Sequence, residues 1–192
     1  MAALVPLSET DVSTIRLLRE KGVLQEIRSD RLPCTSGTIV VACSDGHHFG
    51  DFYEHHRKVC RGEGIPMHHP LSLCGGALLI PEDSPLLIDN GHRSHDDEVL
   101  LRHLRVSYDV KQATTIILAA HAPCGMARAC NLSIMECLEL LVSAKDRVRG
   151  LFDRSVIISG HFHVFYPDGR RLSYHLDRPS WNAMKLEQLV TA

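Results

Sequence analysis

The sequence predicts an α/β fold, with a mostly parallel central sheet flanked by helices and an antiparallel hairpin at its C-terminal end. Three observations support this prediction. Short β-branched runs alternate along the chain with longer amphipathic segments, which is typical of strands connected by helices. The runs end in turn residues, as buried parallel strands do. The last two runs flank Asp168-Gly169, and an Asp-Gly pair between such runs is a strong hairpin signal.

The first half of the chain is predicted to hold two helices and two strands. A cap-like Ser-Glu-Thr-Asp begins an amphipathic helix over 8–29. Its apolar positions are Ile15, Leu17, Leu18, Val23 and Leu24. The next elements are a buried strand over 37–46, a helix over 48–64 closed by Gly62 or Gly64, and a second strand over 71–81 stopped by Pro81.

The second half begins with a loop over 82–95 and an amphipathic helix over 96–110. The core positions expected in that helix are Val99, Leu100, Leu104 and Val106. The remaining elements are a strand over 113–120, a long helix over 126–150, a strand over 155–167 and a returning strand over 170–176.

Length and composition favour one domain over residues 1–192. The chain has 192 residues, of which 44% are hydrophobic, and this suits a single compact core. We divide it into an N-terminal helical arm (1–35), an α/β core (36–176) and a C-terminal tail (177–192). Trp181 is expected to anchor this tail or a partner chain.

The charge and the apolar runs argue against two classes of partner. The formal net charge is -2, with no strongly basic half, so an electrostatic footprint for nucleic acid is missing. No apolar run approaches the ~20 residues that span a bilayer. The N-terminal residues lack the pattern of a signal peptide. We therefore expect a cytoplasmic protein that binds neither nucleic acid nor membrane.

Cysteine and histidine are the residues most suggestive of chemistry. The seven cysteines are an odd and unevenly spaced set, which favours free thiols or metal ligands over a disulfide framework. The thirteen histidines raise the expectation of a metal or proton-transfer site. Most of them are still expected at the surface, including His55 and His56 on a solvated helix face. His161 and His163 share one face of a strand, and we expect a surface or interface position for both.

Three of these residues are predicted to converge. Cys43 ends one strand, and His121 and Cys124 follow another. In open parallel sheets, ligands bind outside the carboxyl ends of the strands. Two sulfurs and one imidazole form a familiar zinc set that leaves a fourth position for water or substrate. Taken alone, His-x-x-Cys also fits a core histidine beside an ordinary buried thiol.

The stretches "VVACSDG" (40–46) and "ILAAHAPCG" (117–125) resemble the β-class carbonic anhydrases. In that family one strand ends in Cys-x-Asp-x-Arg and a later one in Gly-His-x-x-Cys-Gly. The resemblance covers about residues 36–176 of this chain and includes the closing hairpin. It implies a zinc ion (Zn²⁺) held by Cys43, His121 and Cys124. It also implies reversible hydration of CO2 to bicarbonate by zinc-bound hydroxide, in a homodimer or higher homo-oligomer.

The chain departs from the family pattern beside the predicted metal. His47 stands where the family has arginine, so the Asp–Arg pair is broken. Histidine makes fewer hydrogen bonds to a carboxylate than arginine and titrates near neutrality. Asp45 is therefore expected either to use His47 as its partner or to close on the zinc as a fourth ligand. Asp45 and His47 are the predicted catalytic residues, and His47 or His48 is the predicted proton carrier.

Other departures affect the neighbouring strand ends. The family's Arg-Asn-Ala-Gly falls on 73–76, which reads Leu-Cys-Gly-Gly here, and Ala120 replaces a glycine. Cys74 is a weaker metal-ligand candidate. Gly125 begins the next helix and is a predicted substrate-binding position, because a helix N-terminus favours anions. Two alternative functions follow: hydrolysis of a CO2-like substrate such as carbonyl sulfide or carbon disulfide, and a non-catalytic zinc scaffold with a closed site.

Overall fold

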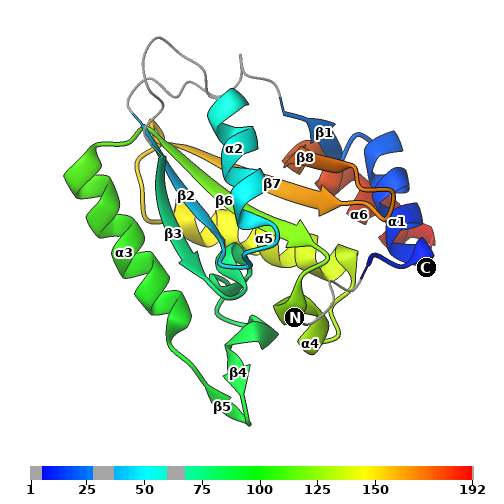
Figure 1. Ribbon diagram of the computed structural model, residues 1–192, viewed down its shortest axis with the longest axis horizontal. Coiled ribbons are helices and arrows are strands. Elements are labelled where there is room, and N and C mark those ends of the chain that lie inside the picture. The colour runs from blue at the N-terminus through cyan, green and yellow to red at the C-terminus, as the bar shows by residue number, and fades with distance from the viewer. Residues whose placement is uncertain (1–5, 28–36, 60–67, 192) are drawn as a thin grey trace.

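The computed structural model describes residues 6–27, 37–59 and 68–191 and is built around a six-stranded sheet (Figure 1). The strands are β1 (Leu24–Glu26), β2 (Thr38–Cys43), β3 (His68–Leu73), β6 (Thr115–Ala122), β7 (Ile157–Phe165) and β8 (Arg171–Leu176). Their order in the sheet is β1-β8-β7-β6-β2-β3. Strands β3, β2, β6 and β7 run parallel, and β8 returns antiparallel to β7. The predicted α/β fold with its C-terminal hairpin is confirmed.

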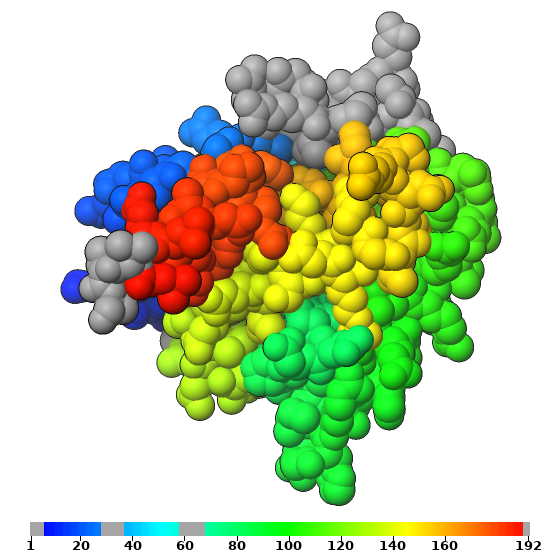
Figure 2. Space-filling model, turned by 180° about the vertical axis from the view of Figure 1, so that it is seen from behind, coloured from blue at the N-terminus to red at the C-terminus, as the bar shows by residue number. Residues whose placement is uncertain are grey.

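Helices cover both faces of the sheet. They are α1 (Glu9–Glu20), α2 (Phe49–Val59), α3 (Asp96–Lys111), α4 (Gly125–Ala129), α5 (Ile134–Arg149) and α6 (Arg178–Thr191). Helix α2 crosses one face, whereas α5 crosses the other (Figure 1). The view from behind shows α5 beside α6, with α1 next to α6 (Figure 2). Every residue of β2 and β6 is buried, as expected for central parallel strands covered on both faces.

The first predicted helix is too long. Helix α1 ends at Glu20, because Gly22 takes a left-handed conformation with a φ of 73° and turns the chain. Val23 and Leu24 are buried as expected, but the chain there enters β1, which pairs antiparallel with β8. Leu17 is exposed rather than in the core. The predicted end of this helix at 28–29, like the helix end at Gly62 or Gly64, lies outside the described residues.

The second predicted strand was placed too late in the chain. Strand β3 ends at Leu73, and a 3-10 helix, η2 (Gly76–Leu79), replaces its expected second half. The expected loop over 82–95 contains a second 3-10 helix, η3 (Pro85–Leu87), and a small hairpin of β4 (Ile88–Asp89) and β5 (His92–Arg93).

The two later helices also differ in detail from prediction. In α3, Leu100 and Leu104 are buried as expected, but Val99 and Val106 are exposed. The long helix predicted over 126–150 is two helices, α4 and α5. Asn131 has a φ of 55°, which ends the first, and Ser133 forms a capping box with Glu136, which begins the second.

The C-terminal tail forms helix α6. Trp181 on this helix is buried in the main hydrophobic core, so the expected anchor of the tail is confirmed. Among the described residues, no helix combines the length and apolar character needed to cross a membrane.

Candidate metal centre

The three predicted ligands are brought together by neighbouring strands. Strands β2 and β6 pair in parallel, with Val41 opposite Leu118, so their carboxyl ends lie side by side. Cys43 is the last residue of β2, His121 lies near the end of β6, and Cys124 precedes α4. One donor atom from each lies within 4.8 Å of the other two, and all three residues are buried.

The two thiols share one proton in the absence of a metal. The hydrogen bond from Cys124 lowers the pKa of Cys43 to about 4, against the opposing effect of burial, and His121 adds to the shift. The pKa of Cys124 is raised, first by this same hydrogen bond and then by burial. A buried pair of this kind ionises as a unit, one thiolate first. An anionic sulfur beside an imidazole is therefore ready for a cation.

A glycine pair supports Cys43 from the neighbouring strand end. The backbone N–H of Gly75 donates a hydrogen bond of 3.2 Å to the Sγ of Cys43. Gly76 packs so closely that a Cβ there would lie 2.3 Å from the backbone N of Cys43. Only glycine permits this approach. This role was not predicted from the sequence, although a Gly-Gly pair after a strand is a visible signal.

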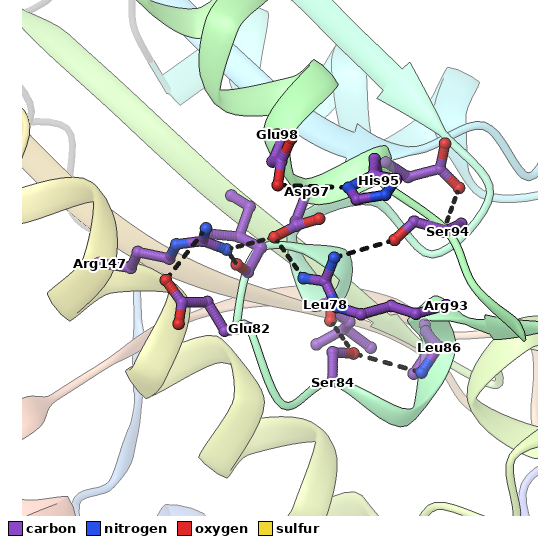
Figure 3. A network of polar contacts seen from close by, with 12 residues as sticks. Leu78, Glu82, Ser84, Leu86, Arg93, Ser94, His95, Asp97, Glu98 and Arg147 are labelled. Atoms are coloured by element: carbon purple, nitrogen blue, oxygen red, sulfur yellow. Dashed lines mark hydrogen bonds and ion pairs between the residues drawn. The ribbon is translucent and has the colours of Figure 1, made fainter.

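A buried ion network holds the segment that follows these glycines (Figure 3). The carboxylate of Asp97 is fully buried and accepts hydrogen bonds from Arg93 (2.9 Å) and Arg147 (2.7 Å). Burial raises the pKa of Asp97, but hydrogen bonds from both arginines more than offset this effect and hold it below its usual range. Arg147 lies on α5 and also contacts the carbonyl of Ile80 and the carboxylate of Glu82. The network thus fixes η2 and the start of α3 to α5.

The second predicted group, Asp45 and His47, lies just outside the thiols. The Oδ1 atom of Asp45 accepts a hydrogen bond of 2.9 Å from the backbone N–H of His47, whose side chain is exposed. Polar atoms of Asp45, His48 and His121 lie within 4.8 Å of one another. The ring of His48 is buried, with its centroid 4.4 Å from that of His121. Burial and His121 lower the pKa of His48 to about 4, so His48 is neutral near pH 7.

Two weaker predictions concern Cys74 and Gly125. Cys74 is exposed, and its sulfur lies 3.3 Å from the hydroxyl of Ser44. Among the described residues it does not belong to either cluster of possible metal-binding atoms. Gly125 begins α4, and a Cβ added there would meet nothing within 4 Å. The space beside Gly125 is therefore open.

Several histidines expected at the surface are buried between α2 and the sheet. His56, His161 and His163 are almost fully enclosed, which contradicts their predicted exposure, and His55 is half-buried. The Nε2 atom of His56 lies 3.0 Å from the Nδ1 of His161, whose Nε2 lies 2.9 Å from the hydroxyl of Ser159. Burial lowers the pKa of His56 and His161 well below the ordinary value, so both are neutral. A neutral ring costs less to bury than a charged one, and the hydrogen bonds of His161 to His56 and Ser159 offset part of that cost.

Two cavities border the cluster. A small one of about 10 Å³ lies on the α2 side, lined by Cys43, His48, Phe52 and His121, and has room for about one water molecule. A larger one of about 390 Å³ reaches His121 and Cys124 from the side of α4 and the start of α1.

The donor set fits zinc. Two sulfurs and one imidazole nitrogen match a catalytic zinc site with three protein ligands. Both ring nitrogens of His121 are buried and lack a hydrogen-bond partner among the described residues, which leaves one free for a cation. Soft sulfur donors disfavour magnesium and calcium.

Comparisons with known proteins yield structural matches. No family model and no curated protein sequence matches the chain. Similar solved structures include a variant of the β-carbonic anhydrase CafD of Aspergillus fumigatus, 14% identical over 81% of this chain and 99% of that chain, with a TM-score of 0.45. A carbonic anhydrase from Streptococcus mutans is 16% identical over 90% of this chain and 100% of that one, with a TM-score of 0.40. A carbon disulfide hydrolase is 14% identical over 86% and 90%, with a TM-score of 0.40.

Proposed function

We propose that this chain is a zinc-dependent enzyme that hydrates CO2 reversibly to bicarbonate. The observation that carries the proposal is the buried convergence of Cys43, His121 and Cys124 at the carboxyl ends of two neighbouring parallel strands. Zinc, when bound, supplies a Lewis acid that makes water a nucleophile near neutral pH. The two thiolates and the imidazole would hold the ion.

The surroundings of Cys43 suit this role. Its thiolate accepts the N–H of Gly75, which offsets part of the cost of burying its charge. Two thiolates leave less net positive charge at the centre than three imidazoles would. With zinc bound, water at this centre would ionise less readily, so we expect activity to rise with pH.

Asp45 is the proposed positioning group for the reacting water. The backbone amide of His47 holds its carboxylate, in the place where a guanidinium is expected. A backbone donor does not titrate, so the hold on Asp45 persists across neutral pH. In the alternative arrangement, Asp45 turns inward and becomes a fourth, permanent ligand in a closed site.

The test is stopped-flow CO2 hydration by zinc-loaded protein between about pH 7 and 9, with zinc content measured on each sample. We expect activity that rises with pH and is lost, together with zinc, in Cys124→Ser. A zinc-loaded protein without activity on CO2 would contradict the proposal. Parallel assays with carbonyl sulfide and carbon disulfide would then identify hydrolysis of a CO2-like substrate.

Asp45→Asn separates the two roles of Asp45. As a positioning group, Asp45 can be replaced with full retention of zinc but a loss of hydration rate. As a fourth ligand, its replacement weakens zinc binding, and the wild-type protein shows no hydration. The expected homo-oligomer and cytoplasmic location remain predictions, and light scattering on the zinc-loaded protein tests the first.

A further inference from the structure

The larger cavity is more polar than CO2 requires. It has a volume of about 390 Å³, roughly thirteen times the share of one liquid water molecule, and reaches both His121 and Cys124. CO2 is small and carries no net charge. Arg128 and Asn131 nevertheless line this cavity.

Arg128 is placed close to the predicted metal ligands by α4. Its backbone N–H bonds to the carbonyl of Cys124 at 3.0 Å, so Arg128 lies one helical turn beyond that residue. The side chain is exposed and extends from a short, well-defined helix. Within residues 6–27, 37–59 and 68–191, its guanidinium makes no hydrogen bond or ion pair. By contrast, Arg93 and Arg147 are bound to Asp97.

Among the described residues, no acidic group of the cavity forms an ion pair with Arg128. Asp11 also lines it, but its carboxylate accepts hydrogen bonds from the backbone N–H (3.1 Å) and hydroxyl (2.7 Å) of Ser8 at the start of α1. The hydroxyl of Ser133 is likewise engaged by Glu136. Arg128 is therefore a cation without an ion-pair partner among the described residues, in a cavity that also reaches two of the predicted metal ligands, His121 and Cys124.

We propose that Arg128 binds a planar, carboxylate-like monoanion in this cavity. Arg128 would thereby make the cavity specific for the charged product of the reaction over neutral CO2. The guanidinium presents a planar fork of donors that matches the two oxygens of such an anion, whereas a neutral gas gains little from it. Asn131, which also lines the cavity, offers a neutral amide for a further hydrogen bond. The inference rests on the proposed function for the identity of the anion as bicarbonate; a small organic carboxylate has the same chemistry.

The test measures the binding of ¹³C-labelled bicarbonate and of ¹³C-labelled acetate at pH 8, using NMR line broadening. It is made with zinc-loaded and with metal-free protein. We expect Arg128→Gln to weaken binding at least tenfold in both forms. Arg128→Lys should recover only part of it, because lysine keeps the charge but loses the fork. Tighter binding of bicarbonate than of acetate identifies the reaction's own product, and the reverse identifies an organic carboxylate.

Arg154→Gln is the matched control. Arg154 is exposed, lies between α5 and β7 at the opposite end of the parallel strands, and has no side-chain bond among the described residues. Its loss removes the same charge and should leave binding unchanged. The inference is overturned if wild-type protein binds neither anion, if Arg128→Gln binds as well as wild type, or if Arg154→Gln is weakened equally.

Hydration measured on the same samples separates this inference from the proposed function. Arg128-dependent binding without hydration overturns the proposed function and leaves the anion site standing. Hydration together with anion binding that is unchanged in Arg128→Gln overturns the anion site and leaves the proposed function standing.

Discussion

On the side of the sheet that α5 covers, β6 contributes Ile116, Leu118 and Ala120 to one large aliphatic core. On the side that α2 covers, β7 contributes Ser159, His161 and His163, and the apolar cluster is small. The first side is held mainly by apolar contacts, which are indifferent to pH. The second is held in part by hydrogen bonds between rings that must stay neutral to remain buried.

This contrast has a consequence for the candidate metal centre, which lies where the two sides meet. Cys43 packs in the large apolar core, whereas the ring of His121 packs at a tilt against that of His48, which directly precedes α2. The apolar packing on one side therefore holds Cys43 in place, whereas titratable groups surround His121 on the other side. The following predictions test how far the two sides differ.

Truncation in the aliphatic core should have the largest effect. Leu141 on α5 is fully buried and packs beside Gly160 of β7. Leu141→Ala should lower the free energy of unfolding by about 2–5 kcal/mol, through lost burial and the cavity left behind. Urea unfolding at pH 7.5 measures this loss. The same substitution at Leu186, which is 64% exposed on α6, should change stability by less than about 0.5 kcal/mol. Equal losses would mean that α5 does not anchor the core.

The histidine side should make stability depend on pH. Burial keeps the pKa of His56 and His161 well below 6.5 in the folded chain, so only the unfolded chain takes up protons as the pH falls. Stability is therefore complete above about pH 6.5 and is lost below it, by about 1.4 kcal/mol per histidine and pH unit. His161→Gln should flatten this slope by the share of one histidine.

Urea unfolding between pH 7.5 and 5.5, with a chelator present to exclude metal release, measures the slope. His92→Gln serves as the control, because His92 is exposed on β5 and should leave the slope unchanged. An identical slope in wild type and His161→Gln would show that the buried ring is not a source of acid sensitivity.

The smallest expected effect concerns the start of α5. Ser133 accepts the backbone N–H of Glu136 and donates its hydroxyl to that residue's carboxylate. Ser133→Ala should cost about 1 kcal/mol of unfolding free energy. Ser143 is exposed on the same helix and provides the matched control, for which Ser143→Ala should be nearly neutral. A cost of similar size at both positions would contradict the capping role.

The sequence revealed the centre of the molecule better than its edges. The end of β2 and the end of β6 were predictable because continuous β-branched runs mark central strands, and parallel strands bring their carboxyl ends together. That reasoning anticipated the meeting of Cys43 with His121 and Cys124. The break between α4 and α5 was missed because it depends on the left-handed backbone of Asn131 and the cap at Ser133.

The buried histidines were missed for a different reason. The partners of His161 are His56, from a helix more than a hundred residues earlier, and Ser159 on its own strand. The residue type alone predicts an exposed position for a histidine unless such partners are known. The support that Gly75 gives Cys43 likewise depends on a contact between separate strand ends.

The contact between Gly75 and Cys43 couples the free energy of cation binding at the sulfur to the free energy of ordering the segment that holds Gly75. Gly75 lies in the segment whose Ile80 carbonyl accepts a hydrogen bond from Arg147 of α5, and Arg147 also pairs with Asp97. An ion network on another part of the chain therefore helps to position the sulfur. Binding of a cation at the sulfur and ordering of that segment are then thermodynamically linked. If the site binds a metal as proposed, we expect a change that loosens the network to weaken metal binding, and the bound metal to stabilise a segment that it does not contact.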